Sequence, residues 1–331
     1  MSANRPHVVY LVLLIVTAVS AVGALFVGSV DLSDDSLRQI LLGLRGVRAT
    51  AAFVVGAALA VAGVLVQGLF RNPLASPSII GTTSGAALGG RLAILAHGLT
   101  VGVGKAAKIS PDALLPIGCF AGALLSLLAL LLIARKRDDL VVLLLTGFLL
   151  SSLFISVGGL VLSIAQDRWG LARAMVVFAL GDVSGATPAQ IWLALPLLLF
   201  GTVAAWLWGR PLDLMLSGEE EAATLGIDVV QLRRWVIIWT AMLTGAAVAI
   251  GGSIGFVGLV VPHALRPWVG AAHRWLTPAA FLLGGSFVMV CDLLARSVPG
   301  QGEVPLGAVT GLVGAPLFLW MLLRSRRSLH V

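Results

Sequence analysis

Residues 44–90 read LRGVRATAAFVVGAALAVAGVLVQGLFRNPLASPSIIGTTSGAALGG. An apolar run of about 20 residues, long enough to cross a bilayer, ends there at a polar Arg-Asn-Pro break. Pro73, Pro77 and a run rich in Gly, Ser and Thr follow. Helix breakers are tolerated within a membrane only where the backbone is buried in protein or lines a wet cavity. The stretch therefore predicts a pathway through a membrane rather than a simple anchor.

The composition of the whole chain supports a membrane protein. Hydrophobic residues make up 59% of it and charged residues 11%, whereas soluble domains carry about 25% charged residues. We predict one all-α, polytopic membrane domain over residues 1–331, with about ten transmembrane helices. The expected spans are 7–28, 48–70, 79–99, 113–134, 140–165, 190–209, 235–252, 254–270, 276–295 and 305–323.

Charge and cysteine placement constrain the topology and the partners. The span 7–28 is too long for the apolar region of a cleaved signal peptide. Ten spans put both termini on one side, and the Lys/Arg bias favours the cytoplasm.

The net charge of +7 needs no nucleic-acid partner, because anionic membrane lipid accounts for it. Cys119 and Cys291 fall within spans, so we expect buried thiols rather than a disulfide or a metal site.

The chain also repeats itself. Residues 56–63 read GAALAVAG and residues 245–252 read GAAVAIGG, an offset that also carries Pro73 onto Pro262. The two copies lie an odd number of predicted spans apart, which predicts an inverted repeat with the substrate path between the halves. Chance similarity of Gly/Ala-rich packing helices is the alternative.

The longest polar segment is residues 210–234, RPLDLMLSGEEEAATLGIDVVQLRR. Ser217 is a suitable N-cap, and Glu219, Glu220 and Glu221 suit the first turn of a helix. Gly226 would end this helix in the left-handed conformation, and a short second helix would cover Val229–Arg234. The segment suits docking onto another protein, although a solvated loop would have the same composition.

These pieces together resemble the FecCD-type permeases. LRGVR, GAALAVAGVLVQ, RNPLASP and SGAALG are similar to the first half of that family. LMLSGEEEAATLGIDV, GFVGLVVPHALRPWVGAAHR, CDLLAR and EVPLGAVTGLVGAPLFLWMLLR are similar to the second half. Ala272, Ser78 and Arg91 depart from the usual pattern, which bears on the substrate more than on the architecture.

The resemblance implies the type II fold of ABC importer permeases in a bacterial inner membrane. The partners it implies are a second copy of the chain, two cytoplasmic ATP-binding subunits and a periplasmic substrate-binding protein. No permanently bound cofactor or metal is implied. The cargo would be haem, a ferric siderophore or cobalamin, and the string GLFRNPLA followed by SGAALGG favours haem.

Site residues follow from the same resemblance. Binding-protein docking is expected at Arg45, Arg48 and Arg296, with interfacial snorkelling as the alternative. Coupling to the ATPase is expected at Ser217, Glu219, Glu220, Glu221, Ala223 and Gly226. Haem contacts are possible at Arg91, His263 and His273, through a propionate or the iron. For Arg91, whose role depends on haem as the cargo, a structural role is the alternative. For the histidines, the alternative is a helix cap or a structural hydrogen bond.

The span 140–165 is expected to line the translocation path. It carries no charge and supplies small and hydroxylated residues, which suit a large cargo that must be released. The path residues are Thr146, Gly147, Ser151, Ser152 and Ser156. Helix packing alone would use the same residue types.

Two other functional classes fit less well. Gly104-Lys105 suggests a phosphate-binding loop, but that motif needs Gly at 99 and Ser or Thr at 106, where the chain has Leu99 and Ala106. ATP hydrolysis is therefore expected in a separate subunit, and the chain itself is not expected to be an enzyme. An ion-coupled transporter would need carboxylates within its spans, and Asp292 is the one good candidate. No motif typical of an intramembrane enzyme is found.

Overall fold

The computed structural model describes residues 6–27, 35–102, 111–134, 140–298 and 304–327. Within these ranges every regular element is a helix. The elements are α1 (Pro6–Phe26), α2 (Asp35–Leu69), the 3-10 turn η1 (Pro77–Ile80), α3 (Thr82–Gly102), α4 (Pro111–Ala134), α5 (Leu140–Ala165), α6 (Trp169–Leu180), α7 (Pro188–Leu207), α8 (Gly209–Met215), α9 (Glu219–Thr224), α10 (Val229–Gly251), α11 (Val257–Val269), α12 (His273–Ser297) and α13 (Leu306–Arg327).

Eight of the ten predicted spans are helices long and apolar enough to cross a membrane. They are α1, α2, α4, α5, α7, α10, α12 and α13. The predicted span 79–99 is α3, which has 21 residues but is less apolar because it carries Arg91, His97 and several glycines. The predicted span 254–270 is α11, which has only 13 residues. At 1.5 Å per residue α11 is about 20 Å long, short of the roughly 30 Å hydrocarbon core.

The core is built around α2, whose most apolar window is 89% buried. Small residues let its neighbours approach its backbone. A Cβ added at Gly56 would lie 2.1 Å from the carbonyl oxygen of Gly284 on α12, and one added at Gly63 would lie 2.0 Å from that of Gly258 on α11. Close backbone contact of this kind is how membrane helices associate without a hydrophobic driving force. The sequence GAALAVAG therefore serves helix packing as well as marking the repeat.

The packing of the two halves follows the sequence repeat. Helix α2 packs on α12 and α11, and its counterpart α10 packs on α4 and α3. The α3–α4 contact again uses glycines, because Cβ atoms at Gly85 and Gly89 would clash with the carbonyl oxygens of Gly122 and Gly118. The halves differ at the break, since α2 continues to Leu69 while α10 ends earlier in the motif, at Gly251.

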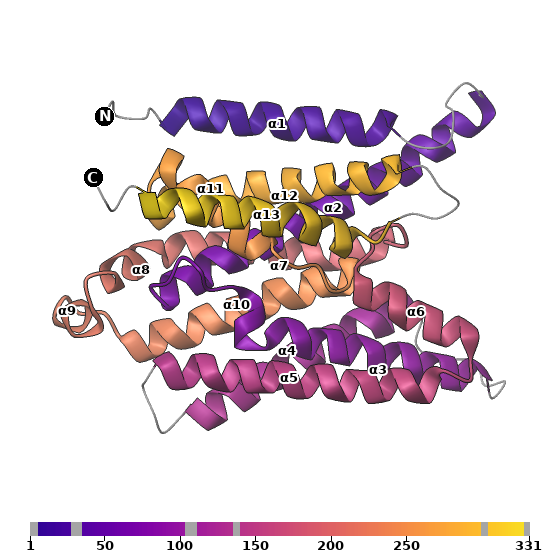
Figure 1. Ribbon diagram of the computed structural model, residues 1–331, viewed down its shortest axis with the longest axis horizontal. Coiled ribbons are helices and arrows are strands. Elements are labelled where there is room, and N and C mark those ends of the chain that lie inside the picture. The colour runs from indigo at the N-terminus through magenta and orange to yellow at the C-terminus, as the bar shows by residue number, and fades with distance from the viewer. Residues whose placement is uncertain (1–5, 28–34, 103–110, 135–139, 299–303, 328–331) are drawn as a thin grey trace.

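The two ends of the molecule carry different elements (Figure 1). The start of α1, the end of α13 and the short helix α9 lie together at the left of the view, whereas α6 lies toward the right. Helix α1 therefore begins, and helix α13 ends, at the end of the molecule that carries the polar segment 210–234. The side of the membrane on which this end lies stays a prediction.

Candidate functional site

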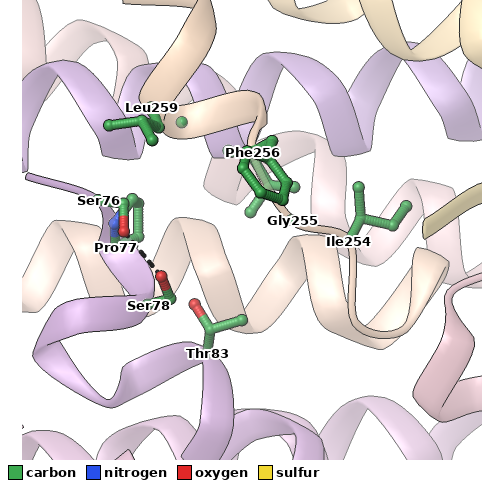
Figure 2. A pocket seen from close by; sticks show the side chains of 10 residues that line it. Ser76, Pro77, Ser78, Thr83, Ile254, Gly255, Phe256 and Leu259 are labelled. Atoms are coloured by element: carbon green, nitrogen blue, oxygen red, sulfur yellow. Dashed lines mark hydrogen bonds between the residues drawn. The ribbon is translucent and has the colours of Figure 1, made fainter. Parts of the chain in front are cut away.

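A cavity of about 210 Å³ lies where the two halves interrupt their helices. Figure 2 shows Ser76, Pro77 and Ser78 of the α2–α3 connection opposite the segment that leads into α11. Phe256, which precedes α11, has a φ of 66°, a backbone conformation rare for non-glycine residues and frequent at functional sites. The cavity is smaller than the roughly 300 Å³ at which ordinary ligand pockets begin.

Helix α5 divides the predicted path residues between two faces. On the packed face, Ser151 donates a hydrogen bond to the carbonyl oxygen of Ser78 at 3.0 Å, and a Cβ at Gly147 would lie 2.2 Å from the carbonyl oxygen of Ile79. Thr146 is buried as well. Ser152 and Ser156 are on the exposed face and bond to carbonyls of their own helix. The structure thus buries three of the five, two of them against η1, and leaves Ser152 and Ser156 exposed.

Arg91 lies midway along α3, against α5. A Cβ added at Gly158 of α5 would lie 2.3 Å from its Nη1 atom. Its Nε atom is buried without a hydrogen-bond partner, while the side chain as a whole is half-buried. Arginine in the middle of a membrane helix is costly and usually faces protein or a water-filled cavity. The role of Arg91 toward cargo stays a prediction.

The three predicted docking arginines belong to a buried charge cluster that joins α1, α2 and α12. Arg45 donates to the carbonyl oxygens of Leu25 and Phe26 at 3.1 and 3.3 Å. Arg48 lies 2.8 Å, and Arg296 3.2 Å, from the carboxylate of Asp292. Asp292 is 1% exposed.

This cluster gives the arginines structural partners inside the chain, and docking to a binding protein stays a prediction. The carboxylate of Asp292 is held between two guanidinium groups. That arrangement does not favour the proton or cation site that a coupled transporter would need there.

The two predicted histidines differ. His263 is half-buried on α11, with its ring 5.5 Å from that of Phe318 on α13. His273 is 2% exposed at the start of α12, and its Nδ1 lies 2.6 Å from Asp213 of α8. Asp213 also accepts the backbone N–H of His273 at 3.1 Å. His273 therefore fits the structural alternative, because Asp213 accepts the first backbone N–H of α12 and also binds the ring.

The polar segment 210–234 differs from its prediction in two places. The N-cap of α9 is Gly218 rather than Ser217, so no side chain caps the helix. The expected short helix Val229–Arg234 is the first turns of the long α10, capped by Asp228. Gly226 does adopt the predicted left-handed conformation, with a φ of 85°.

Glu219 fastens α9 to the rest of the molecule. Both of its carboxylate oxygens lie 3.2 Å from Arg233 of α10, and Arg71, after α2, lies 4.0 Å away. Glu220, Glu221, Ala223 and Gly226 remain exposed. The helix is thus anchored on one side and presents a small, acidic surface on the other.

Sequence reasoning missed two polar residues that join elements. Gln67, 1% exposed near the end of α2, donates to the carbonyl oxygens of Gly258 and Leu259 and accepts from Arg266 at 3.0 Å. Asp213 is the other. The available signal was a lone amide ending an apolar run, which must find partners when it is buried.

Both cysteines are buried and free, as expected. Within the described ranges, no group of three or more His, Cys, Asp or Glu residues could hold a metal ion.

Comparison with known proteins identifies the family. The chain matches the FecCD transport family over residues 7–324. It is 36% identical to the hemin transport system permease protein HmuU of Yersinia pestis, over 98% of each chain. It is 37% identical to the Fe(3+) dicitrate transport system permease protein FecD of Escherichia coli K12, over 87% of this chain and 86% of the relative. It is 38% identical to the vitamin B12 import system permease protein BtuC of Vibrio cholerae, over 93% and 89%.

Solved structures agree with this assignment. A structure assigned to the metal-chelate type of ABC transporter, in an inward-facing conformation, superimposes with a TM-score of 0.85 at 32% identity, covering 97% of this chain and all of that one. PsaBC from Streptococcus pneumoniae shares the fold at a TM-score of 0.57 and 18% identity, over 87% and 93%. Because a single family model covers nearly all of this all-helical, multi-pass chain, the protein belongs to the FecCD transport family of ABC importer permeases.

Proposed function

We propose that the chain is the membrane subunit of an ATP-driven importer that carries haem from a periplasmic binding protein into the cytoplasm. The observation that carries this proposal is the similarity to a hemin permease over 98% of both chains. The relatives named for ferric dicitrate and vitamin B12 are about as similar, so ferric siderophore and cobalamin are the alternative cargoes. The proposed location is a bacterial inner membrane, with both termini in the cytoplasm.

Coupling to ATP hydrolysis is proposed to occur at α9. This helix lies at one end of the molecule (Figure 1), is fastened by Glu219 to Arg233, and exposes Ala223 and Gly226. Because α9 is exposed and is attached to α10 by an ion pair, a movement of a docked subunit would be passed to α10. Two cytoplasmic ATPase subunits, one per copy of the chain, would each receive one such helix in a cleft.

A homodimer is proposed to form the cargo route. The cavity at the broken helices, about 210 Å³, is too small for a macrocycle, so a route for haem needs space between two copies. Helix α5 offers a surface for this, since only 22% of its most apolar window is buried. A two-fold axis alongside α5 would bring Ser152 and Ser156 of both copies toward the route.

Arg91 is the residue proposed to favour an anionic cargo. Its guanidinium lies half-buried beside Gly158 on α5. A propionate of haem could form a charge-assisted, bidentate contact with this group. His263 is the second candidate, because it is half-buried and its Nδ1 has no hydrogen-bond partner. Arg48 and Arg296 are proposed to orient the binding protein through the small fraction of their side chains that remains exposed, 13% and 6%.

The test is the identity of the cognate partners. The tagged chain is purified from its native membrane, and the co-purified subunits are identified by mass spectrometry. The binding protein encoded with it is then titrated with haem, ferric siderophores and cobalamin. The proposal predicts a co-purified ATPase and a binding protein that prefers haem. Preference for another cargo would replace haem, and the absence of any ATPase would contradict the importer itself.

A further inference from the structure

A second groove, of about 500 Å³, lies on the surface at the end of the molecule that carries α9. It is lined by Trp206, Leu207, Arg210, Arg274 and Trp275, from the end of α7, the start of α8 and the start of α12. The hydroxyl of Tyr10, near the start of α1, donates to the carbonyl oxygen of Trp275. Aromatic residues from the ends of three candidate spans therefore gather at one level. Trp and Tyr gather in this way where a membrane helix meets the headgroup region.

The groove carries two positive charges and no acid in its lining. Arg210 and Arg274 are both exposed. Among the described residues, neither makes an ion pair or a hydrogen bond, and the neighbouring Asp213 is occupied by His273. The guanidinium of Arg274 lies 4.8 Å from the ring centroid of Trp275, which orients it. Arginine pairs suit phosphate, because each planar fork can hold two of its oxygens.

An apolar strip leads away from the two arginines along α7. Trp206 and Leu207 are 51% and 62% exposed. Further back along the helix, Val203, Phe200 and Leu199 are also exposed. A soluble anion has no use for such a strip, whereas a phospholipid has a charged head at one end and apolar chains that would follow the helix into the bilayer.

We propose that this groove is a specific site for an anionic phospholipid, with its phosphate on Arg210 and Arg274 and an acyl chain along α7. Basic pockets between membrane helices are suited to anionic head groups. The site also abuts Asp213 and His273, which join α8 to α12. A bound lipid would therefore lie next to the elements that carry α9. The proposal depends on the membrane fold and is independent of the cargo.

The test compares lipid retention by the purified protein and by its Arg210→Gln, Arg274→Gln double variant. Both are incubated with mixed micelles of phosphatidylglycerol and phosphatidylcholine, and bound lipid is counted by native mass spectrometry. At roughly 1 kcal/mol per arginine near an anionic surface, the preference for phosphatidylglycerol should fall by about thirtyfold in the double variant. Both arginines are exposed, so the variant should fold, and its melting temperature checks this.

Arg324→Gln is the matched control. Arg324 of α13 also lies over a tryptophan, Trp320, at 5.2 Å, but it does not line this groove. Its removal should lower the lipid preference by no more than about fivefold, which corresponds to the roughly 1 kcal/mol of any single arginine near an anionic surface. An equal loss in this control would show a general charge effect and overturn the site.

Three further outcomes would overturn the proposal. The unmodified protein could retain both lipids equally. Inorganic phosphate alone could displace the bound lipid at equal concentration, which would make this a site for free anions. The double variant could keep its lipid preference but lose a co-purified acidic partner, which would make the groove a protein-docking surface. Retention of phosphatidylglycerol that depends on both arginines and resists inorganic phosphate would support it.

Discussion

Replacing Asp292 by Asn tests the buried charge cluster that joins α2 to α12. The substitution keeps the shape of the side chain and removes its charge. It leaves Arg48 and Arg296, whose side chains are 13% and 6% exposed, without the carboxylate between them. Removing one partner of a buried ion pair costs about 3–5 kcal/mol, because the remaining charge stays desolvated. Two arginines share this carboxylate, so we expect a loss in the upper part of that range.

Thermal unfolding of the purified protein measures this loss. At roughly 2 °C per kcal/mol for a large domain, the upper part of this range lowers the melting temperature by about 8–10 °C. The control is Asp228→Asn, at the exposed cap of α10, where a lost cap costs about 1 kcal/mol. Its melting temperature should fall by about 2 °C.

A triple variant separates stability from docking. Replacing Arg48, Asp292 and Arg296 together by Met, Leu and Met removes all three charges, which is often neutral for stability. We expect a melting temperature near that of the starting protein, together with weaker association with the binding protein. If Asp292→Asn alone melted within about 1 °C of the starting protein, the cluster would contribute little to the free energy of unfolding. That result would refute the predicted cost of removing the carboxylate.

Three further predictions address coupling, the route and packing. Ala223→Trp on the exposed face of α9 should leave ATP hydrolysis in a reconstituted complex but lower uptake per ATP, and full uptake would contradict docking at α9. In a background without cysteines, a cysteine replacing the exposed Ser156 should react faster with a water-soluble thiol reagent than one replacing Ser151. The reason is that Ser151 is packed against Ser78. Equal rates would argue against two distinct faces of α5. Gly89→Leu should lower the free energy of unfolding by at least about 3 kcal/mol, because its Cβ would lie 2.0 Å from a carbonyl oxygen of α4. Gly159→Leu should leave it unchanged, because nothing lies within 4 Å of a Cβ there. Similar melting temperatures for the two variants would contradict the α3–α4 packing.

Much of the fold could be predicted from the sequence because the local apolar composition identifies membrane spans. Runs of apolar residues located α1, α2, α4, α5, α7, α10, α12 and α13. The internal repeat predicted two related halves, and in the structure α10 packs on α3 and α4 as α2 packs on α11 and α12. The 12-residue helix α6 and the shortness of α11 were missed, because a hydropathy pattern does not show where a helix is interrupted inside protein.

The sites were less predictable, since they depend on contacts between distant parts of the chain. Arg48 and Asp292 are 244 residues apart in sequence, and Nε of Arg48 lies 2.9 Å from the carboxylate of Asp292. Asp213 and His273 are 60 residues apart and meet at 2.6 Å. No local pattern in the sequence indicates such pairs. By contrast, Gly226 was predictable because a left-handed residue after a helix follows from local sequence alone.

The measurement that tests the central claim most directly is uptake of haem into proteoliposomes. The vesicles contain the chain with its cognate ATPase subunit, carry ATP and Mg²⁺ inside, and are given the haem-loaded binding protein outside. The account predicts that haem accumulates only when ATP and the loaded binding protein are both present, and that a non-hydrolysable ATP analogue stops it. Haem uptake driven by an ion gradient in vesicles that lack the ATPase would contradict it.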